Sequence, residues 1–289
     1  MQAVDLFDEV FVECGGGRAG GAGARISVDM RPAGAVIPET DNLAYKAAVL
    51  MAEHFAPAGA AAPPDLRILI HKNIPLSAGL AGGSSDAAAV MLALAGQWDI
   101  DADLARLCAL STEIGADVPF CLAANAKING SRYAPDPTAT STALAEGIGD
   151  LLTPLPAPPG ALIILNPDLA LSTPHIYEVY DDAPEKAARP DTDGFLRELR
   201  GDGLSKAAPA IDAFMVNALE YAAASESPET ARLLAGVKST LPCAAVFLSG
   251  SGPSVAAYFP KRAEAEEALP LARERFEKNG VKVFFAPIL

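Results

Sequence analysis

The residues with the clearest capacity for chemistry lie in one glycine- and serine-rich stretch, IPLSAGLAGGSSDAAA, from Ile74 to Ala89. Its glycines allow the backbone to turn sharply and to approach a ligand closely. The apolar run Ala87–Leu94 predicts a helix that begins near Ser84. The unpaired N–H groups at such a helix start favour phosphate, and serine hydroxyls there can donate to phosphate or bind magnesium.

A glycine turn followed by a serine cap would produce a similar local pattern. The stretch is not a Walker A loop, because no Gly-Lys-Ser/Thr ends it, and it is not GxGxxG. From these residues alone, a phosphate-binding loop and an ordinary capped turn both stay open.

Three further segments carry candidate chemistry. Asp117, in GADVPF, offers a carboxylate for general-base work or a turn cap before Pro119. Tyr177, in TPHIY, is either an aromatic face for a base or a packing residue, and His175, two positions before it, is expected to have no role in the reaction. The segment LSGSGPS, from Leu248 to Ser254, is either a glycine turn that supports a site or an ordinary hairpin turn.

The stretch around Gly79 resembles the phosphate loop of the GHMP kinases, and its form GLAGGSSDAA resembles the branch of 4-diphosphocytidyl-2-C-methyl-D-erythritol kinases. Ala81 replaces the glycine usual in that branch, which we expect to cost little if the φ angle there is negative. GADVPF, TPHIY, LSGSGPS and Asp41-Asn42-Leu43 agree in order with four more segments of the family. The resemblance extends over nearly the whole chain.

The resemblance implies a role for each matching residue. It places on ATP the residues Asn42, Pro75, Leu76, Ser77, Ala78, Gly79, Leu80, Ala81, Gly82, Gly83, Ser84 and Ser85, with Asn42 at the adenine. It implies Asp117 as the catalytic base, Ser85 as a ligand of Mg²⁺, and Thr173, Tyr177, Gly250 and Ser251 as substrate contacts.

The implied reaction transfers a phosphoryl group from ATP, with Mg²⁺, to the 2-hydroxyl of diphosphocytidyl-methylerythritol in the non-mevalonate route to isoprenoid precursors. Two alternatives stay open. One is another GHMP kinase, such as homoserine or mevalonate kinase. The other is a nucleotide-binding but catalytically impaired, truncated relative.

The family's N-terminal Pro-Ala-Lys-Ile-Asn-Leu strand and its Asp-Gly-Tyr-His segment have no counterpart here, because Met1–Asp8 resembles the family segment that comes after both. In the family that lysine lies beside the catalytic aspartate. We therefore expect ATP binding with poor turnover, restored by an upstream extension that encodes the motif. The nearest substitute is Lys127, in a surface insertion predicted over Asn125–Thr142, where a flexible loop would hold a charge poorly.

Composition limits the partners. Lys and Arg number 22 against 36 Asp and Glu, giving 22 − 36 = −14, a charge that disfavours nucleic acid and leaves a small-molecule substrate. The four cysteines form no CxxC pair, which favours reduced thiols over a zinc cluster. No apolar run reaches the roughly 20 residues of a membrane span. We expect a cytoplasmic protein that is a monomer or a weak homodimer.

Strand and helix patterns occur in mixed order, which predicts the α+β class, with an ATP-binding domain over 1–158 and a smaller C-terminal α/β domain over 159–289. Strands are expected at 10–12, 24–30, 66–70, 162–165, 244–248, 255–259 and 281–285. Helices are expected at 41–55, 84–97, 103–114, 264–278 and through most of 172–236. Asp41 is the expected cap of the first helix, and residues 15–23 the expected hairpin connection.

Overall fold

The computed structural model describes residues 1–15, 25–32, 37–55, 65–183, 191–200 and 215–289. The chain forms two compact units, each with contributions from distant segments. The first unit contains Met1–Ala3, Phe7–Asn73 and Ala81–Leu155, and the second contains Val4–Leu6, Ile74–Leu80 and Pro156–Leu289. The expected loop at 56–64, the break near 184–190 and most of the glycine-rich connection lie outside the described residues.

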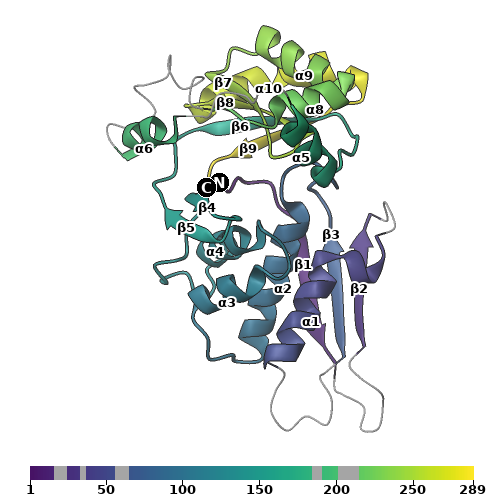
Figure 1. Ribbon diagram of the computed structural model, residues 1–289, viewed down its shortest axis with the longest axis vertical. Coiled ribbons are helices and arrows are strands. Elements are labelled where there is room, and N and C mark those ends of the chain that lie inside the picture. Colours follow the sequence, from purple (N-terminus) through teal and green to yellow (C-terminus); the bar gives the residue numbers. More distant parts are fainter. Residues whose placement is uncertain (16–24, 33–36, 56–64, 184–190, 201–214) are drawn as a thin grey trace. The chain divides into compact units, whose positions relative to one another are not determined.

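A three-stranded sheet supports the first unit, in the order β1-β3-β2 (Figure 1). Its strands are β1 (Glu9–Cys14), β2 (Ile26–Arg31) and β3 (Leu66–His71). β1 runs antiparallel to β3, with Glu9 opposite His71, and β2 runs parallel to β3. The expected hairpin between the first two strands is therefore wrong, because β3 lies between them and takes the backbone hydrogen bonds of both.

Among the described residues of the first unit, four α-helices accompany the sheet: α1 (Leu43–Phe55), α2 (Gly82–Gln97), α3 (Leu104–Ser111) and α4 (Val118–Ile128). They bury their apolar side chains in one core with the sheet, where Met51, Ile68, Leu94 and Leu122 are fully buried. Asn42, not the expected Asp41, caps α1, since its Oδ1 accepts a hydrogen bond from the N–H of Ala44 at 2.9 Å. Asp41 instead ends a short 3₁₀ turn, Glu39–Asp41.

The predicted surface insertion at 125–142 is wrong in two respects. Residues 125–128 form the last turn of α4, a helix absent from the sequence prediction. Beyond it, Tyr133 and Ala139 are buried in the core of the first unit. The segment leads into a hairpin of β4 (Ala143–Glu146) and β5 (Leu151–Pro154).

The second unit is built on a four-stranded antiparallel sheet in the order β7-β8-β6-β9. The strands are β6 (Ala161–Asn166), β7 (Ala245–Leu248), β8 (Val255–Phe259) and β9 (Lys282–Pro287). The described helices are α5 (Thr173–Asp182), α6 (Thr192–Arg200), α8 (Glu220–Glu226), α9 (Pro228–Thr240) and α10 (Arg262–Phe276). Phe259 and Val237 lie in its main core, which joins the sheet to α9 and α10 (Figure 1).

Both units combine a sheet with helices, which confirms the predicted α+β class. Among the described helices, none has the length and apolar character needed to cross a membrane.

Candidate active site

The loop between β3 and α2 has an unusual backbone. Ser77, Gly79 and Ala81 have φ angles of 50°, 70° and 53°, while the residues between them lie outside the left-handed region. Such alternation turns successive backbone N–H groups toward one side and forms the concave nests that bind anions. The loop sequence therefore folds into a shape suited to phosphate.

Gly79 packs against the turn between β7 and β8. A Cβ at Gly79 would lie 2.3 Å from the carbonyl oxygen of Ser249 and 2.7 Å from that of Gly252. The Ser249 hydroxyl donates to the Gly79 carbonyl at 2.8 Å, and the N–H of Ser254 donates to the Ala78 carbonyl at 3.4 Å. The segment LSGSGPS, from Leu248 to Ser254, therefore contacts the first half of the loop directly. Glycine is required at position 79.

Ala81 corrects one expectation. Its φ of 53° and ψ of 27° lie in the left-handed region, so the condition of a negative φ is not met. An alanine there carries a steric cost that glycine avoids. The loop imposes this conformation because α2 begins at the next residue, Gly82, and the Ala81 carbonyl accepts the N–H of Ser85 at 2.9 Å.

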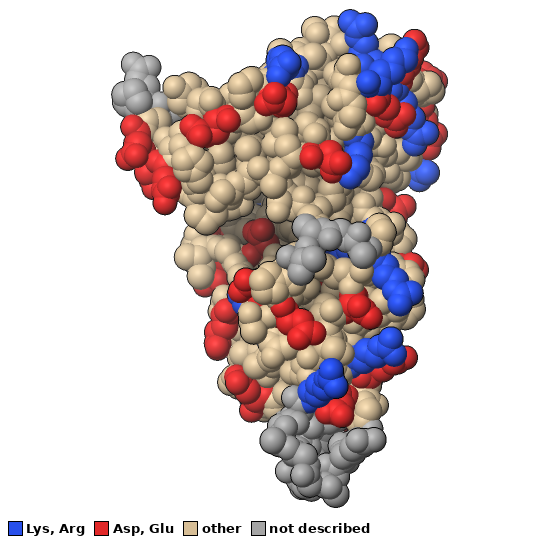
Figure 2. All heavy atoms as spheres, turned by 90° about the vertical axis from the view of Figure 1, so that its right-hand side faces the viewer, with Lys and Arg blue, Asp and Glu red and all other residues tan. Residues whose placement is uncertain are grey.

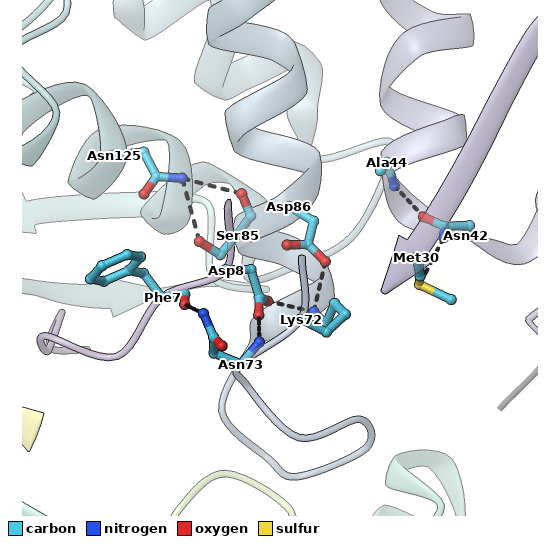
Figure 3. A network of polar contacts seen from close by, with 10 residues as sticks. All are labelled: Phe7, Asp8, Met30, Asn42, Ala44, Lys72, Asn73, Ser85, Asp86 and Asn125. Carbon is cyan, nitrogen blue, oxygen red and sulfur yellow. Dashed lines mark hydrogen bonds and ion pairs between the residues drawn. The ribbon is translucent and has the colours of Figure 1, made fainter. Parts of the chain in front are cut away.

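The start of α2 leaves its backbone donors available. No side chain from the described residues caps this helix start. Gly83 is exposed, whereas Ser84 is buried. Asn125 of α4 holds Ser85, donating to its carbonyl oxygen at 3.2 Å and its hydroxyl at 3.4 Å (Figure 3). An uncapped start of a 16-residue helix, with an oriented serine hydroxyl, can accept a phosphate group.

Asp117 stands at the start of α4 and makes no capping hydrogen bond with its side chain. The residue as a whole is exposed, but protein atoms around the carboxyl group remove water and raise its pKa. The positive charge of the Met1 amino group, which donates to the Ala143 carbonyl at 2.7 Å, acts in the opposite direction on this pKa. The carboxylate is thus free of a capping role and more basic than usual.

Lys127 does not lie beside Asp117. It is an exposed residue in the last turn of α4, whereas Asp117 precedes the first turn. Ten residues of helix at about 1.5 Å each separate them by about 15 Å along the helix axis. Because this helix was not predicted, the sequence placed Lys127 in a loop that could approach Asp117. The structure excludes Lys127 as a substitute cation beside Asp117.

The expected substrate residues of the second unit gather at the start of α5. The hydroxyls of Thr173 and Ser251 lie 2.8 Å apart in a hydrogen bond, and Ser251 is buried. Gly250, next to it, has a φ of 54°. Tyr177 follows Thr173 by one helical turn and is 53% exposed, so its ring does not serve the core.

Asn42 uses its amide within the first unit. Besides capping α1, its Nδ2 lies 3.6 Å from Met30 Sδ, and the residue is buried (Figure 3). The fold alone accounts for this side chain, and its expected place at adenine stays a prediction.

Three charged residues near the loop were given no role from the sequence. Lys72 Nζ lies 2.5 Å from Asp8 Oδ2 and 2.8 Å from Asp86 Oδ2, and all three side chains are at most 9% exposed (Figure 3). Burial raises the pKa of Asp86 to about 7, against the opposing attraction of Lys72. We call these residues the Lys72 cluster. The one available signal was Asp86 itself, a charge inside an otherwise apolar helical run.

Asn217 was missed as well. Its Nδ2 donates to the carbonyls of Leu248 and Gly250 at 2.8 and 2.7 Å, and thereby holds the turn on which Gly79 packs. Nothing in the local sequence marks Asn217, because its partners lie more than 30 positions away.

Comparison with known proteins identifies the family. The family model of the GHMP kinases N terminal domain matches residues 42–125, and that of the GHMP kinases C terminal matches 196–278. A 4-diphosphocytidyl-2-C-methyl-D-erythritol kinase of Clostridium perfringens is 30% identical, covering 98% of this chain and 87% of that protein. One of Syntrophomonas wolfei is 33% identical, covering 98% and 86% respectively.

Solved structures are similar over the same length. A crystal structure of 4-(cytidine 5'-diphospho)-2C-methyl-D-erythritol kinase matches with a TM-score of 0.66 and 28% identity, covering 98% of this chain and 87% of that one. Homoserine kinase from Cytophaga hutchinsonii shares the fold, with a TM-score of 0.68 at 17% identity and coverage of 99% and 88%. The chain therefore belongs to the GHMP kinases, in the family of the 4-diphosphocytidyl-2-C-methyl-D-erythritol kinases.

Proposed function

We propose that this protein transfers the γ-phosphoryl group of ATP to the 2-hydroxyl of 4-diphosphocytidyl-2-C-methyl-D-erythritol, giving ADP and the 2-phosphate. The observation that carries the proposal is the uncapped start of α2 directly after a loop of alternating φ. The names of the relatives supply the acceptor. Catalysis by such an enzyme consists mainly of positioning and electrostatic stabilisation.

In this proposal the triphosphate lies along the loop from Pro75 to Ser85. The N–H groups of the first turn of α2 face its oxygens. The Ser85 hydroxyl, already oriented by Asn125, is a suitable oxygen ligand for Mg²⁺, which needs few protein ligands when phosphates supply the rest. Bound there, Mg²⁺ would offset charge on the β- and γ-phosphates. Asn42 stays our candidate for the adenine.

Asp117 is the proposed general base. Its carboxylate makes no capping bond and its pKa is raised, which strengthens it as a proton acceptor. It takes the proton of the tertiary hydroxyl as that oxygen attacks the γ-phosphorus. The proton stays on a carboxyl oxygen while ADP leaves.

The cytidine end of the acceptor is assigned to the second unit. Tyr177 offers an exposed ring for base stacking, a contact worth about 1–3 kcal/mol. Thr173 and Ser251, bonded to each other, present hydroxyls, and Gly250 offers backbone. A cytidine diphosphate fits this mixture of one aromatic face and short polar groups.

We also propose that the protein works in the cytoplasm, as a monomer or weak homodimer, without nucleic acid as a partner. The net charge of −14 supports the last point. On the face drawn in Figure 2, Lys and Arg lie among Asp and Glu.

The test is a substrate panel. The purified chain is given ATP and Mg²⁺ with diphosphocytidyl-methylerythritol, homoserine or mevalonate, and ADP release is followed. We expect turnover with the first acceptor alone, at the low rate predicted from the sequence. Turnover with homoserine or mevalonate instead would assign the chain to another GHMP activity, and ATP binding without turnover on any acceptor would mark an impaired relative.

A further inference from the structure

The register of the first sheet brings Asp8 and Lys72 together. Glu9 pairs with His71 across β1 and β3, so Asp8 and Lys72 are the next residues at the same end of the ladder. Asp8 also accepts the N–H of Asn73 at 2.6 Å, and the Asn73 side chain donates to the Phe7 carbonyl at 2.9 Å (Figure 3). Lys72 is therefore held where the chain leaves β3 for the loop.

From this anchored position, Lys72 reaches α2. Asp86 lies in the fifth position of that helix, directly after Ser84 and Ser85, and its Oδ2 accepts from Lys72 Nζ at 2.8 Å. The N–H groups of a helix point along its axis toward the N-terminus, so an ion pair that fixes the helix near its start also fixes the direction of the free N–H groups of the first turn. The contact thus orients the helix turn that faces the proposed phosphate position.

The charges of the cluster do not balance. One ammonium lies between two carboxylates, and Asp86 Oδ1 is buried without a hydrogen-bond partner among the described residues. A cluster that served stability alone would satisfy this oxygen or replace it by an apolar group, since buried ion pairs add little net stability. The arrangement points to a function in orientation.

We propose that Lys72 is a positioning residue for ATP, acting through Asp86 on the first turn of α2. The inference rests on the proposed function, because it assumes that this turn binds the triphosphate. It predicts that losing the Lys72–Asp86 contact weakens ATP binding while leaving the acceptor site in the second unit unaffected.

The experiment compares Lys72→Met with the double variant Lys72→Met/Asp86→Asn. The single variant leaves two buried carboxylates without a cation and is expected to lose stability. The double variant restores the cluster's formal charge to −1, as in the unmodified protein, so its melting temperature should largely recover. Lys282→Met, which breaks an exposed ion pair with Asp168, is the matched control.

The readouts are the KM for ATP, the KM for diphosphocytidyl-methylerythritol, and the affinity for a non-hydrolysable ATP analogue with Mg²⁺. We expect the double variant to raise the KM for ATP and the dissociation constant of the analogue by at least about tenfold. The reason is that the first turn of α2 loses its orientation although the formal charge of the cluster is unchanged. The KM for the acceptor should stay within about twofold of the unmodified value.

Recovery of normal ATP affinity in the double variant would overturn the inference and leave Lys72 as a neutraliser of buried charge. An equal rise of both KM values would overturn it too, because it would indicate general disorder. If the unmodified protein fails to bind ATP while folded, the proposed function itself is wrong. A third outcome separates the two proposals. If the unmodified protein binds ATP, Gly83→Val abolishes that binding and the double variant does not change it, then the proposed function stands and only the role of Lys72 is rejected.

Discussion

Gly79 and Ser249 meet backbone to backbone: a Cβ at Gly79 would lie 2.3 Å from the Ser249 carbonyl oxygen, while the Ser249 hydroxyl donates to the Gly79 carbonyl at 2.8 Å. The two residues are 170 positions apart. The loop between β3 and α2 therefore takes part of its shape from the turn between β7 and β8, and only glycine fits at the contact.

Gly79→Ala should lower the free energy of unfolding by about 2–3 kcal/mol, because it combines a left-handed φ with a backbone clash. Urea denaturation measures this. Gly130→Ala is the matched control, since Gly130 has a similar φ of +61° but no atom of the described part of the chain lies within 4 Å of its Cβ position. Equal losses in the two variants would show that the contact with Ser249 adds nothing.

Gly83→Val should abolish ATP binding and preserve the fold. Among the described residues, a Cβ there meets Leu43 alone, with Cδ1 at an ordinary 3.6 Å. The added side chain therefore projects from an exposed position where phosphate is proposed to approach. Titration calorimetry with ATP measures the loss. Gly96→Val lies at the other end of α2, where no atom of the described residues comes within 4 Å of the Cβ position, and it should bind ATP normally. Unchanged ATP affinity in Gly83→Val would remove this turn from the nucleotide site.

Ala81→Gly should raise the free energy of unfolding by about 0.5–1 kcal/mol. Glycine removes the steric cost of a left-handed alanine in the folded state, and this gain exceeds the loss from the greater conformational entropy of glycine in the unfolded chain. Thermal and urea unfolding both report the change. A destabilised Ala81→Gly protein would contradict the left-handed conformation at this position.

Asp117→Asn should keep ATP affinity and reduce turnover by about 10²–10⁴-fold, the usual effect of losing a general base. In the unmodified enzyme, the acid limb of kcat/KM should have its midpoint above the ordinary aspartate pKa, because burial raises the pKa of Asp117. Asp103→Asn, which keeps a capping side chain at α3, is the control. Near-normal turnover in Asp117→Asn would leave this residue as part of a turn.

Asp86 should make stability depend on pH. Its pKa rises from 3.8 to about 7 on folding, so the folded protein binds more protons than the unfolded chain between these values. Stability should therefore fall as the pH rises from about 4 to about 7, and level off above. Besides burial, the groups that act on the pKa of this carboxyl are Lys72, which lowers it, and Asp8, which raises it.

The melting temperature, followed from about pH 4.5 to about pH 8, measures the effect of this titration. Asp86→Asn should flatten the curve, and Asp168→Asn, at an exposed ion pair, should not. Parallel curves for Asp86→Asn and the unmodified protein would show that another group is responsible.

The sequence by itself determined the local features. Alternating apolar residues predicted β3, because side chains of a strand alternate between faces, and glycines and serines before an apolar run predicted the start of α2 within two residues. The ordered motifs predicted the family, since each depends on residue types that a local segment displays directly.

Only the tertiary structure decided the features that depend on distant partners. α4 was missed because eight of its eleven residues are buried, so it lacks the polar face that reveals a helix. The left-handed Ala81, the place of β3 between β1 and β2, and the contacts of Asn217 and Lys72 were not readable from spacing. Strand partners, φ angles in a loop and buried ion pairs are set by packing between segments far apart in the chain, and local periodicity carries no record of them.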